Sequence, residues 1–163
     1  MLLDALFAAS IMVVALGTVV STLTAGAKVG RFNRETALAL NAAESAVETV
    51  ASRAFSEAFA SFSATAATAD APGRYFSVTG LGIRTDDADG FVGEILFPGA
   101  GPELYENADD VELGMPRDLN GDSDIDGIDH AGDYRILPIR VRIEWVGVSG
   151  PRELEIVSTI ANY

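Results

Sequence analysis

The sequence predicts an α+β fold, in which a long N-terminal α-helix with a protruding apolar first half packs on a C-terminal head containing an antiparallel β-sheet of about four strands. Residues 1–27 are almost entirely apolar, and residues 35–62 are rich in Ala and contain neither Gly nor Pro, a composition that favours helix. Residues 139–145 instead alternate apolar with charged side chains, which is the period of a strand that buries one face.

The apolar segment leads us to divide the chain into three parts. These are an apolar membrane or filament-core helix (1–28), an amphipathic continuation of that helix (29–62) and an acidic, β-rich globular head (63–163). Between Asp4 and Lys28 lie 23 uncharged residues, which as a helix would extend about 35 Å and so cross a hydrocarbon core. We therefore expect this segment to lie in a membrane, in a bundle with copies of itself, or in each by turns.

Three interpretations of the segment compete. A secretory signal peptide is disfavoured, because the flank at Asp4 is acidic rather than basic and the helical pattern continues past Lys28. A plain membrane anchor leaves Asp4 unexplained, since a carboxylate inside a membrane costs roughly 3 kcal/mol unless it finds a partner. The third interpretation depends on the residues around Asp4.

The run MLLDALFAASIMVV at residues 1–14 resembles the mature N-terminus of type IV pilins and type II secretion pseudopilins. In that family a basic leader is removed, the new N-terminus is methylated, and an acid lies inside an apolar run that opens a long helix. The family's acid is normally Glu and lies one place further along, so an N-terminal residue is missing here or the spacing is shorter. The usual helix-bending Pro is absent, which leaves Gly17, Gly26 and Gly30 as weak points of the run.

This resemblance covers about a sixth of the chain, and it implies a processed subunit that waits in the inner membrane and then packs with copies of itself into an extracellular filament. Asp4 would pair with the N-terminal amine of a neighbouring subunit and so fix the axial register of the assembly. Two alternatives stay open: a monomeric membrane-tethered calcium-binding domain, and a minor pilin or pseudopilin of a secretion system.

The amphipathic part is expected to continue the same helix from about Leu2 to Ser61, with the change of pattern between residues 28 and 33 marking where the tail leaves the head. Apolar residues recur every three or four positions in this part, which predicts one apolar stripe along the helix. The members of this stripe are Leu40, Ala43, Val47, Val50 and Ala54, extended by Phe55, Phe59 and Phe62.

The head begins with a predicted turn at residues 70–73 and two predicted strands, 75–79 and 91–97, joined by an acidic loop at 86–90. The stretch 98–118 has no clean period and is expected to be irregular.

The last third predicts a β-hairpin that turns at residues 148–151. Its first strand should bury Ile139, Val141, Ile143 and Trp145. The second strand runs from Glu153 toward Ile160, and an outer-face Arg of the first strand should lie opposite an outer-face Glu of the second.

The stretch DLNGDSDIDGID at residues 118–129 is dense in oxygen ligands and resembles the calcium loops of EF-hands and dockerins. We expect Ca²⁺ to be bound there with an affinity of roughly 10⁻⁵ to 10⁻³ M. Ser123 occupies the position where such loops have Gly for a sharp turn. The predicted ligands are Asp118, Asn120, Asp122, Asp126 and Asp129 through their side chains, and Asp124 through its carbonyl.

Other functional classes are disfavoured by composition. The net charge of −13, from 24 acidic and 11 basic residues, argues against nucleic acid as a direct partner. The absence of cysteine excludes thiolate chemistry and disulfides. The only histidine, His130, adjoins the acidic loop and is expected to be a surface or supporting residue rather than a base, so we do not expect an enzyme.

Overall fold

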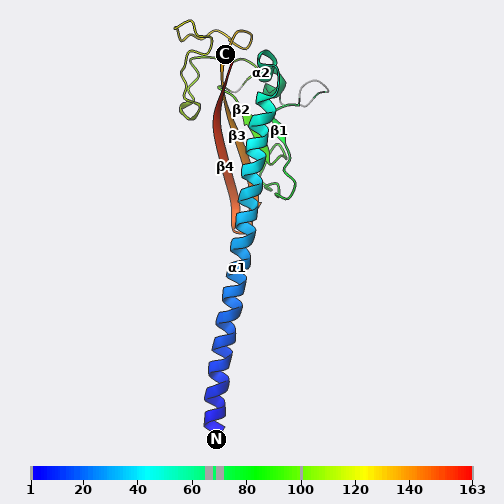
Figure 1. Ribbon diagram of the computed structural model, residues 1–163, viewed down its shortest axis with the longest axis vertical. Coiled ribbons are helices and arrows are strands. Elements are labelled where there is room, and N and C mark those ends of the chain that lie inside the picture. The colour runs from blue at the N-terminus through cyan, green and yellow to red at the C-terminus, as the bar shows by residue number, and fades with distance from the viewer. Residues whose placement is uncertain (1, 65–67, 69–71, 100, 163) are drawn as a thin grey trace.

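A computed structural model describes residues 2–64, 68, 72–99 and 101–162 and has the predicted α+β architecture. Helix α1 (Leu2–Ala51) extends from the head as a single rod, and its last turns lie along a four-stranded antiparallel sheet of order β1-β2-β3-β4 (Figure 1). The predicted turn at 70–73 falls partly outside the described residues.

Helix α1 changes its environment along its length. From Leu3 to Arg34 every side chain is exposed, and burial begins at Glu35. The helix passes unbroken through all three of its glycines, as expected for a run without Pro. The predicted boundary at 28–33 thus lies where the helix first meets the head, since Phe32 contacts Arg152 and burial follows from Glu35.

The buried stripe of α1 differs in part from the predicted one. Leu40 is 41% exposed and Ala54 is exposed, whereas Ala43 and Val50 are fully buried as predicted. The face toward the sheet consists of small residues, because a helix lying along a sheet can approach closely only where its side chains are short. These residues are Ala39, Ala43, Ala46 and Val50.

The prediction of one continuous helix to Ser61 is wrong. α1 ends at Ala51, and a separate helix α2 (Phe55–Ser63) follows after three residues. No Gly or Pro causes the break. Instead, the change of direction lets the rings of Phe59 and Phe62 enter the core, where Phe59 meets Phe97 edge to face at 5.2 Å.

The sheet has two short and two long strands. β1 (Tyr75–Phe76) and β2 (Gly93–Leu96) are shorter than the predicted 75–79 and 91–97. β3 (Ile136–Gly147) and β4 (Gly150–Ala161) are longer than predicted, and the hairpin turns at two residues only, 148 and 149. The stretch 98–118 is irregular in its described part, apart from the short helix η1 (Val111–Leu113).

The hairpin has the predicted faces. Its core-facing set of alternate residues, Ile139, Val141, Ile143 and Trp145, is at most 1% exposed. On the outer face Arg142 lies opposite Glu155, which fixes the register. Arg142 also forms an ion pair with Glu94 of β2 at 2.6 Å, so the charged outer face links neighbouring strands.

The hairpin turn lies against α1 where the helix leaves the head. The Val148 amide donates a hydrogen bond of 3.3 Å to Glu35 Oε2. The guanidinium of Arg152 lies 3.6 Å from the ring centroid of Phe32, a cation–π contact. We name the contacts of Glu35 and Phe32 with this turn the junction.

Candidate functional site

The first functional feature is the exposed apolar surface of α1, which we name the stalk (residues 3–34) and which includes Phe32 of the junction. Its large apolar side chains are mostly 55–70% exposed, and the helix is long and apolar enough to cross a membrane. Asp4 is exposed near the end of this surface. The exposed large side chains are Leu3, Leu6, Phe7, Ile11, Met12, Val13, Val14, Leu16, Val19, Val20, Leu23, Val29 and Phe32.

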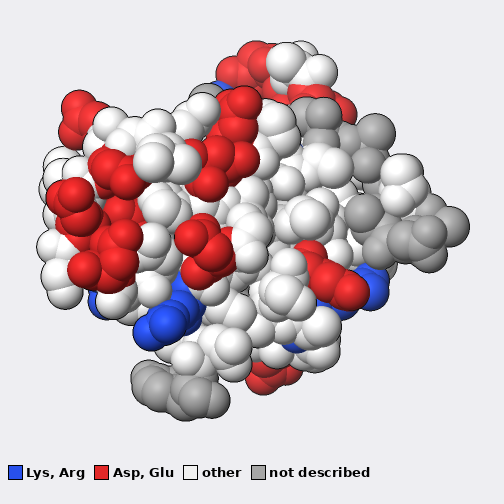
Figure 2. All heavy atoms as spheres, turned by 90° about the horizontal axis from the view of Figure 1, so that it is seen from above, with Lys and Arg blue, Asp and Glu red and all other residues white. Residues whose placement is uncertain are grey.

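The second feature is the acidic loop at the opposite end of the head. Seen along the long axis, this end carries many acidic and few basic side chains (Figure 2). The loop is held by Glu106, which is only 1% exposed and accepts hydrogen bonds from the amides of Leu119 (2.6 Å) and Asn120 (3.1 Å). A buried carboxylate therefore fixes the start of the loop.

The first half of the loop is closed by its own side chains. The Asp118 carboxylate accepts hydrogen bonds from the amides of Gly121 (2.6 Å) and Ser123 (2.8 Å). Asn120 accepts from the Asp122 amide, and Asp122 in turn accepts from the Asp124 amide. These contacts hold the pKa of Asp122 below its usual range, mainly through the bond from the Asp124 amide.

The structure shows how the chain turns at Ser123, where calcium loops usually have Gly. Its φ is +76°, the left-handed conformation that usually requires Gly, so the backbone makes the sharp turn at this position despite the side chain.

In the second half of the loop, the carboxylates of Asp126 and Asp129 bond to groups outside the turn at residues 118–124. The Asp129 carboxylate accepts hydrogen bonds from the amides of Leu104 (2.9 Å) and Ala131 (3.0 Å), which lower its pKa. Asp126 accepts from the Ile128 amide and contacts the ring of His130. The six predicted ligands are thus divided, because the structure gathers residues 118–124 in one turn and directs Asp126 and Asp129 to other partners.

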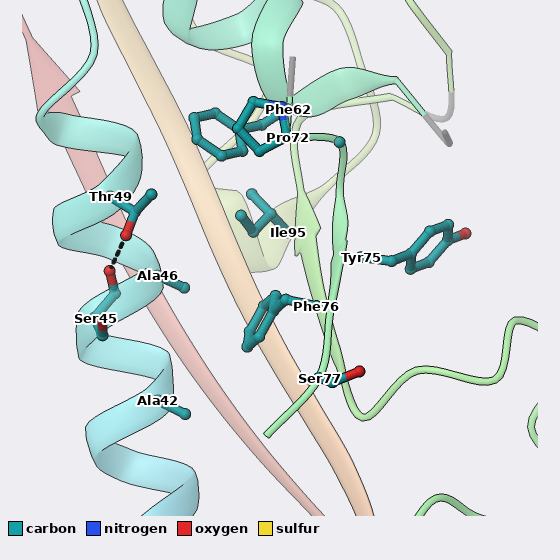
Figure 3. Close-up of a pocket in the computed structure, with 11 residues that line it drawn as sticks. Ala42, Ser45, Ala46, Thr49, Phe62, Pro72, Tyr75, Phe76, Ser77 and Ile95 are labelled. Carbon is teal, nitrogen blue, oxygen red and sulfur yellow. Dashed lines mark hydrogen bonds between the residues drawn. The ribbon is translucent and has the colours of Figure 1, made fainter. Parts of the chain in front are cut away.

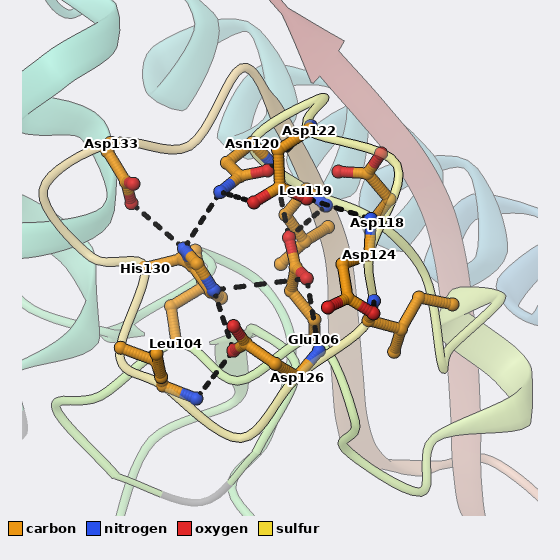
Figure 4. A network of polar contacts seen from close by, with 12 residues as sticks. Leu104, Glu106, Asp118, Leu119, Asn120, Asp122, Asp124, Asp126, His130 and Asp133 are labelled. Atoms are coloured by element: carbon orange, nitrogen blue, oxygen red, sulfur yellow. Dashed lines mark hydrogen bonds and ion pairs between the residues drawn. The ribbon is translucent and has the colours of Figure 1, made fainter.

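His130 is buried, 5% exposed, so the expectation of a surface position is wrong. Its Nε2 lies 3.1 Å from Asp126 Oδ1 and 3.8 Å from Glu106 Oε2, and its Nδ1 lies 3.0 Å from Asp133 Oδ1 (Figure 4). Burial disfavours the imidazolium, but the bonds to Asp126 and Asp133 outweigh it and raise the pKa of His130. Asn120 connects His130 to the first half of the loop, because its side-chain nitrogen lies 3.5 Å from His130 Nδ1 and donates a hydrogen bond of 3.1 Å to Asp122.

Glu106, Asp126 and His130 form a group that can hold a metal ion, since one ligand atom from each lies within 4.8 Å of the others. Only Asp126 of this group was predicted. Glu106 is far from the loop in sequence and has no local signal that separates it from other acids. Asp133 was also missed, although its place three residues after the only histidine is a usable signal.

A third feature is a groove of about 290 Å³ between α1 and β1 (Figure 3). Ala42, Ala46, Phe62, Phe76 and Ile95 form its apolar walls, and Tyr75 is the only titratable residue among the described residues that line it.

The functional features are therefore an exposed apolar stalk at one end of the molecule and a polar, partly buried carboxylate–histidine network at the other. Comparison of the chain with protein-family models, with curated proteins and with solved structures finds no match in any of the three.

Proposed function

We propose that this protein is a structural subunit of a type IV pilus-like filament, assembled through the stalk. The supporting observation is that the stalk continues into the head as one unbroken helix, yet all its side chains from Leu3 to Val29 are exposed. Burying one Leu, Ile, Val or Phe side chain contributes about 1.5–3 kcal/mol, so a surface of this length strongly favours an apolar environment.

Two environments meet this requirement in succession. In the inner membrane, lipid covers the stalk and the acidic head stays in water outside the bilayer. In an extracellular, cell-surface filament, the stalks of neighbouring copies cover one another and the heads form the outer wall. The N-terminal sequence resemblance favours this pathway.

Asp4 has a role in both states. A carboxylate among apolar helices is costly unless it meets a positive group, and a methylated N-terminal amine of the next subunit carries such a charge. Pairing the carboxylate with the amine compensates for the cost of burying each group. It also fixes one axial position of each subunit relative to the next.

Electron microscopy of the full chain after removal of detergent tests the proposal. Filaments several nanometres wide are expected. The alternative function, a monomeric membrane-tethered binding domain, predicts particles with no filaments at any protein concentration. If the protein is instead a minor pilin or pseudopilin, it will be scarce relative to another subunit in filaments sheared from cells.

We further propose that the acidic loop binds Ca²⁺, which stabilises the head. The left-handed turn at Ser123 and the bonds from the amides of residues 121 and 123 to Asp118 support this proposal, because calcium loops need that turn at their sixth position. Asp118, Asn120 and Asp122 would supply side-chain oxygens and Asp124 its carbonyl. With Asp126 and Asp129 directed elsewhere, water would complete the shell, and the affinity would be weak, about 10⁻⁴ to 10⁻³ M.

A further inference from the structure

We propose that the partly buried group of Glu106, Asp126 and His130 is a second metal site, selective for a divalent transition metal of the Zn²⁺ class. Imidazole nitrogen with carboxylate oxygen suits such ions, whereas Ca²⁺ takes oxygen ligands only. This site is separate from the calcium turn at residues 118–124.

The spacing of the three ligand atoms supports the assignment. Zn²⁺ binds nitrogen and oxygen at about 2.0–2.2 Å, so two ligands of a tetrahedral site lie about 3.4 Å apart. The distances from His130 Nε2 to the Asp126 and Glu106 oxygens, 3.1 and 3.8 Å, lie on either side of this value. A metal ion can therefore be placed with small side-chain movements.

Asp133 supplies an independent indication. Metal-binding histidines generally donate their other ring N–H to a carboxylate, which fixes the tautomer and directs the free nitrogen at the metal. His130 Nδ1 lies 3.0 Å from Asp133 Oδ1, on the opposite side of the ring from the other two carboxylates (Figure 4). Asp133 is thus a positioning residue for His130 Nε2.

Two of the three ligands are buried, and an ion bound there would have a structural effect. The side chains of Glu106 and His130 are 1% and 6% exposed, and that of Asp126 is 32% exposed. The ion would join the segment at residue 106 to the loop that ends at His130, two parts of the head distant in sequence. Three protein ligands leave one coordination position for water.

Co²⁺ titration of the full chain in detergent micelles, with millimolar Ca²⁺ present to saturate the calcium turn, tests the site. We expect one equivalent to bind and to give the visible absorption of a four-coordinate ion, and Zn²⁺ to displace it. His130→Gln should abolish this absorption. Asp133→Asn should weaken binding roughly 10- to 100-fold, as loss of such supporting carboxylates does.

The matched control is Glu153→Gln, an exposed acid on β4 near the hairpin turn, which should leave Co²⁺ binding unchanged. Unchanged binding in His130→Gln, or loss of binding in Glu153→Gln, would overturn the proposal. Failure of the unmodified chain to bind either ion would also overturn it.

If His130→Gln does not fold, as judged by circular dichroism, X-ray absorption of the Zn²⁺-loaded unmodified chain gives a second test. The sequence has one histidine and no cysteine, so an imidazole signal identifies His130 as the ligand. A spectrum with oxygen ligands only contradicts the assignment.

Discussion

The hydroxyl of Tyr134 donates a hydrogen bond to the backbone carbonyl of Phe55, at the first turn of α2. The same hydroxyl accepts a hydrogen bond of 3.2 Å from the Phe59 amide. These two backbone groups are four residues apart, the spacing that an α-helix pairs internally. One side chain from the segment before β3 therefore fixes where α2 begins, and its burial raises the pKa of the phenol.

Tyr134→Phe should destabilise the head by about 2 kcal/mol, because two hydrogen bonds are lost and the buried ring is kept. Thermal unfolding followed by circular dichroism measures the change. Tyr75→Phe is the matched control, since Figure 3 shows the Tyr75 ring directed away from the neighbouring groove. Equal losses in the two variants would contradict a special role of the Tyr134 hydroxyl.

Asp4→Ala should leave the head folded but yield few or no filaments, since the pair that sets the axial offset is lost. Asp4→Glu keeps the charge and should restore assembly at least in part. Filament yield is counted by electron microscopy at matched protein concentration. A normal yield from Asp4→Ala would show that the carboxylate has no part in assembly.

Calcium should raise the melting temperature of the full chain in detergent. At 1 mM Ca²⁺ and a dissociation constant near 10⁻⁴ M, mass action stabilises the folded head by about 1.4 kcal/mol relative to chelator. Replacing Asp118 and Asp122 together by Ala should abolish the difference. Asp124→Ala should retain it, because that residue is expected to bind through its carbonyl; loss of the response there would disprove this ligand assignment.

Acid should destabilise the head partly through Asp129. The amides of Leu104 and Ala131 lower the pKa of this carboxyl in the folded state. Its contribution is therefore fully present above the unfolded pKa, near 3.9, and is lost as the pH falls through the lower folded value. In chelator, Asp129→Asn should unfold less steeply below pH 4, because Asn still accepts hydrogen bonds but does not titrate. An unchanged acid profile would exclude this residue as a source of the dependence.

Gly93→Ala should destabilise the sheet by roughly 1–3 kcal/mol, because an added Cβ would lie 2.3 Å from the ring of Phe76. The Phe76 ring of β1 can lie this close to the β2 backbone only because Gly93 has no side chain. Gly132→Ala is the control, since nothing lies within 4 Å of its added Cβ. Denaturant unfolding compares the two, and a similar stability for both variants would argue against the steric explanation.

The parts of the fold that the sequence could predict are those governed by local periodicity. Trp145 and Ile143 recur at every second position, and the strand that buries them follows directly. The end of α1 could not be predicted, because Ala51 and Ser52 carry no breaking signal. Tyr134, which is distant in the sequence, bonds to backbone groups of Phe55 and Phe59 directly after that break.

The candidate site also has one part that the local sequence predicts and another that depends on residues distant in the sequence. An oxygen-rich loop could be expected from the spacing of Asp118 and its neighbours, but the left-handed turn at Ser123 could not, because such loops usually have Gly there. The burial of Glu106 beneath that loop could not, since only the three-dimensional path of the irregular segment brings it near His130.

The junction has a mechanical consequence. α1 packs along β3 and β4, and Glu35 and Phe32 hold the hairpin turn at the point where the helix leaves the head. Tension applied along the stalk therefore enters the head parallel to the long strands and loads the helix–sheet contact in shear. Contacts loaded in this way share the force along their whole length instead of opening one at a time from an end. The molecule is thus suited to bear axial load, and its first point of failure under a sideways force is the junction itself.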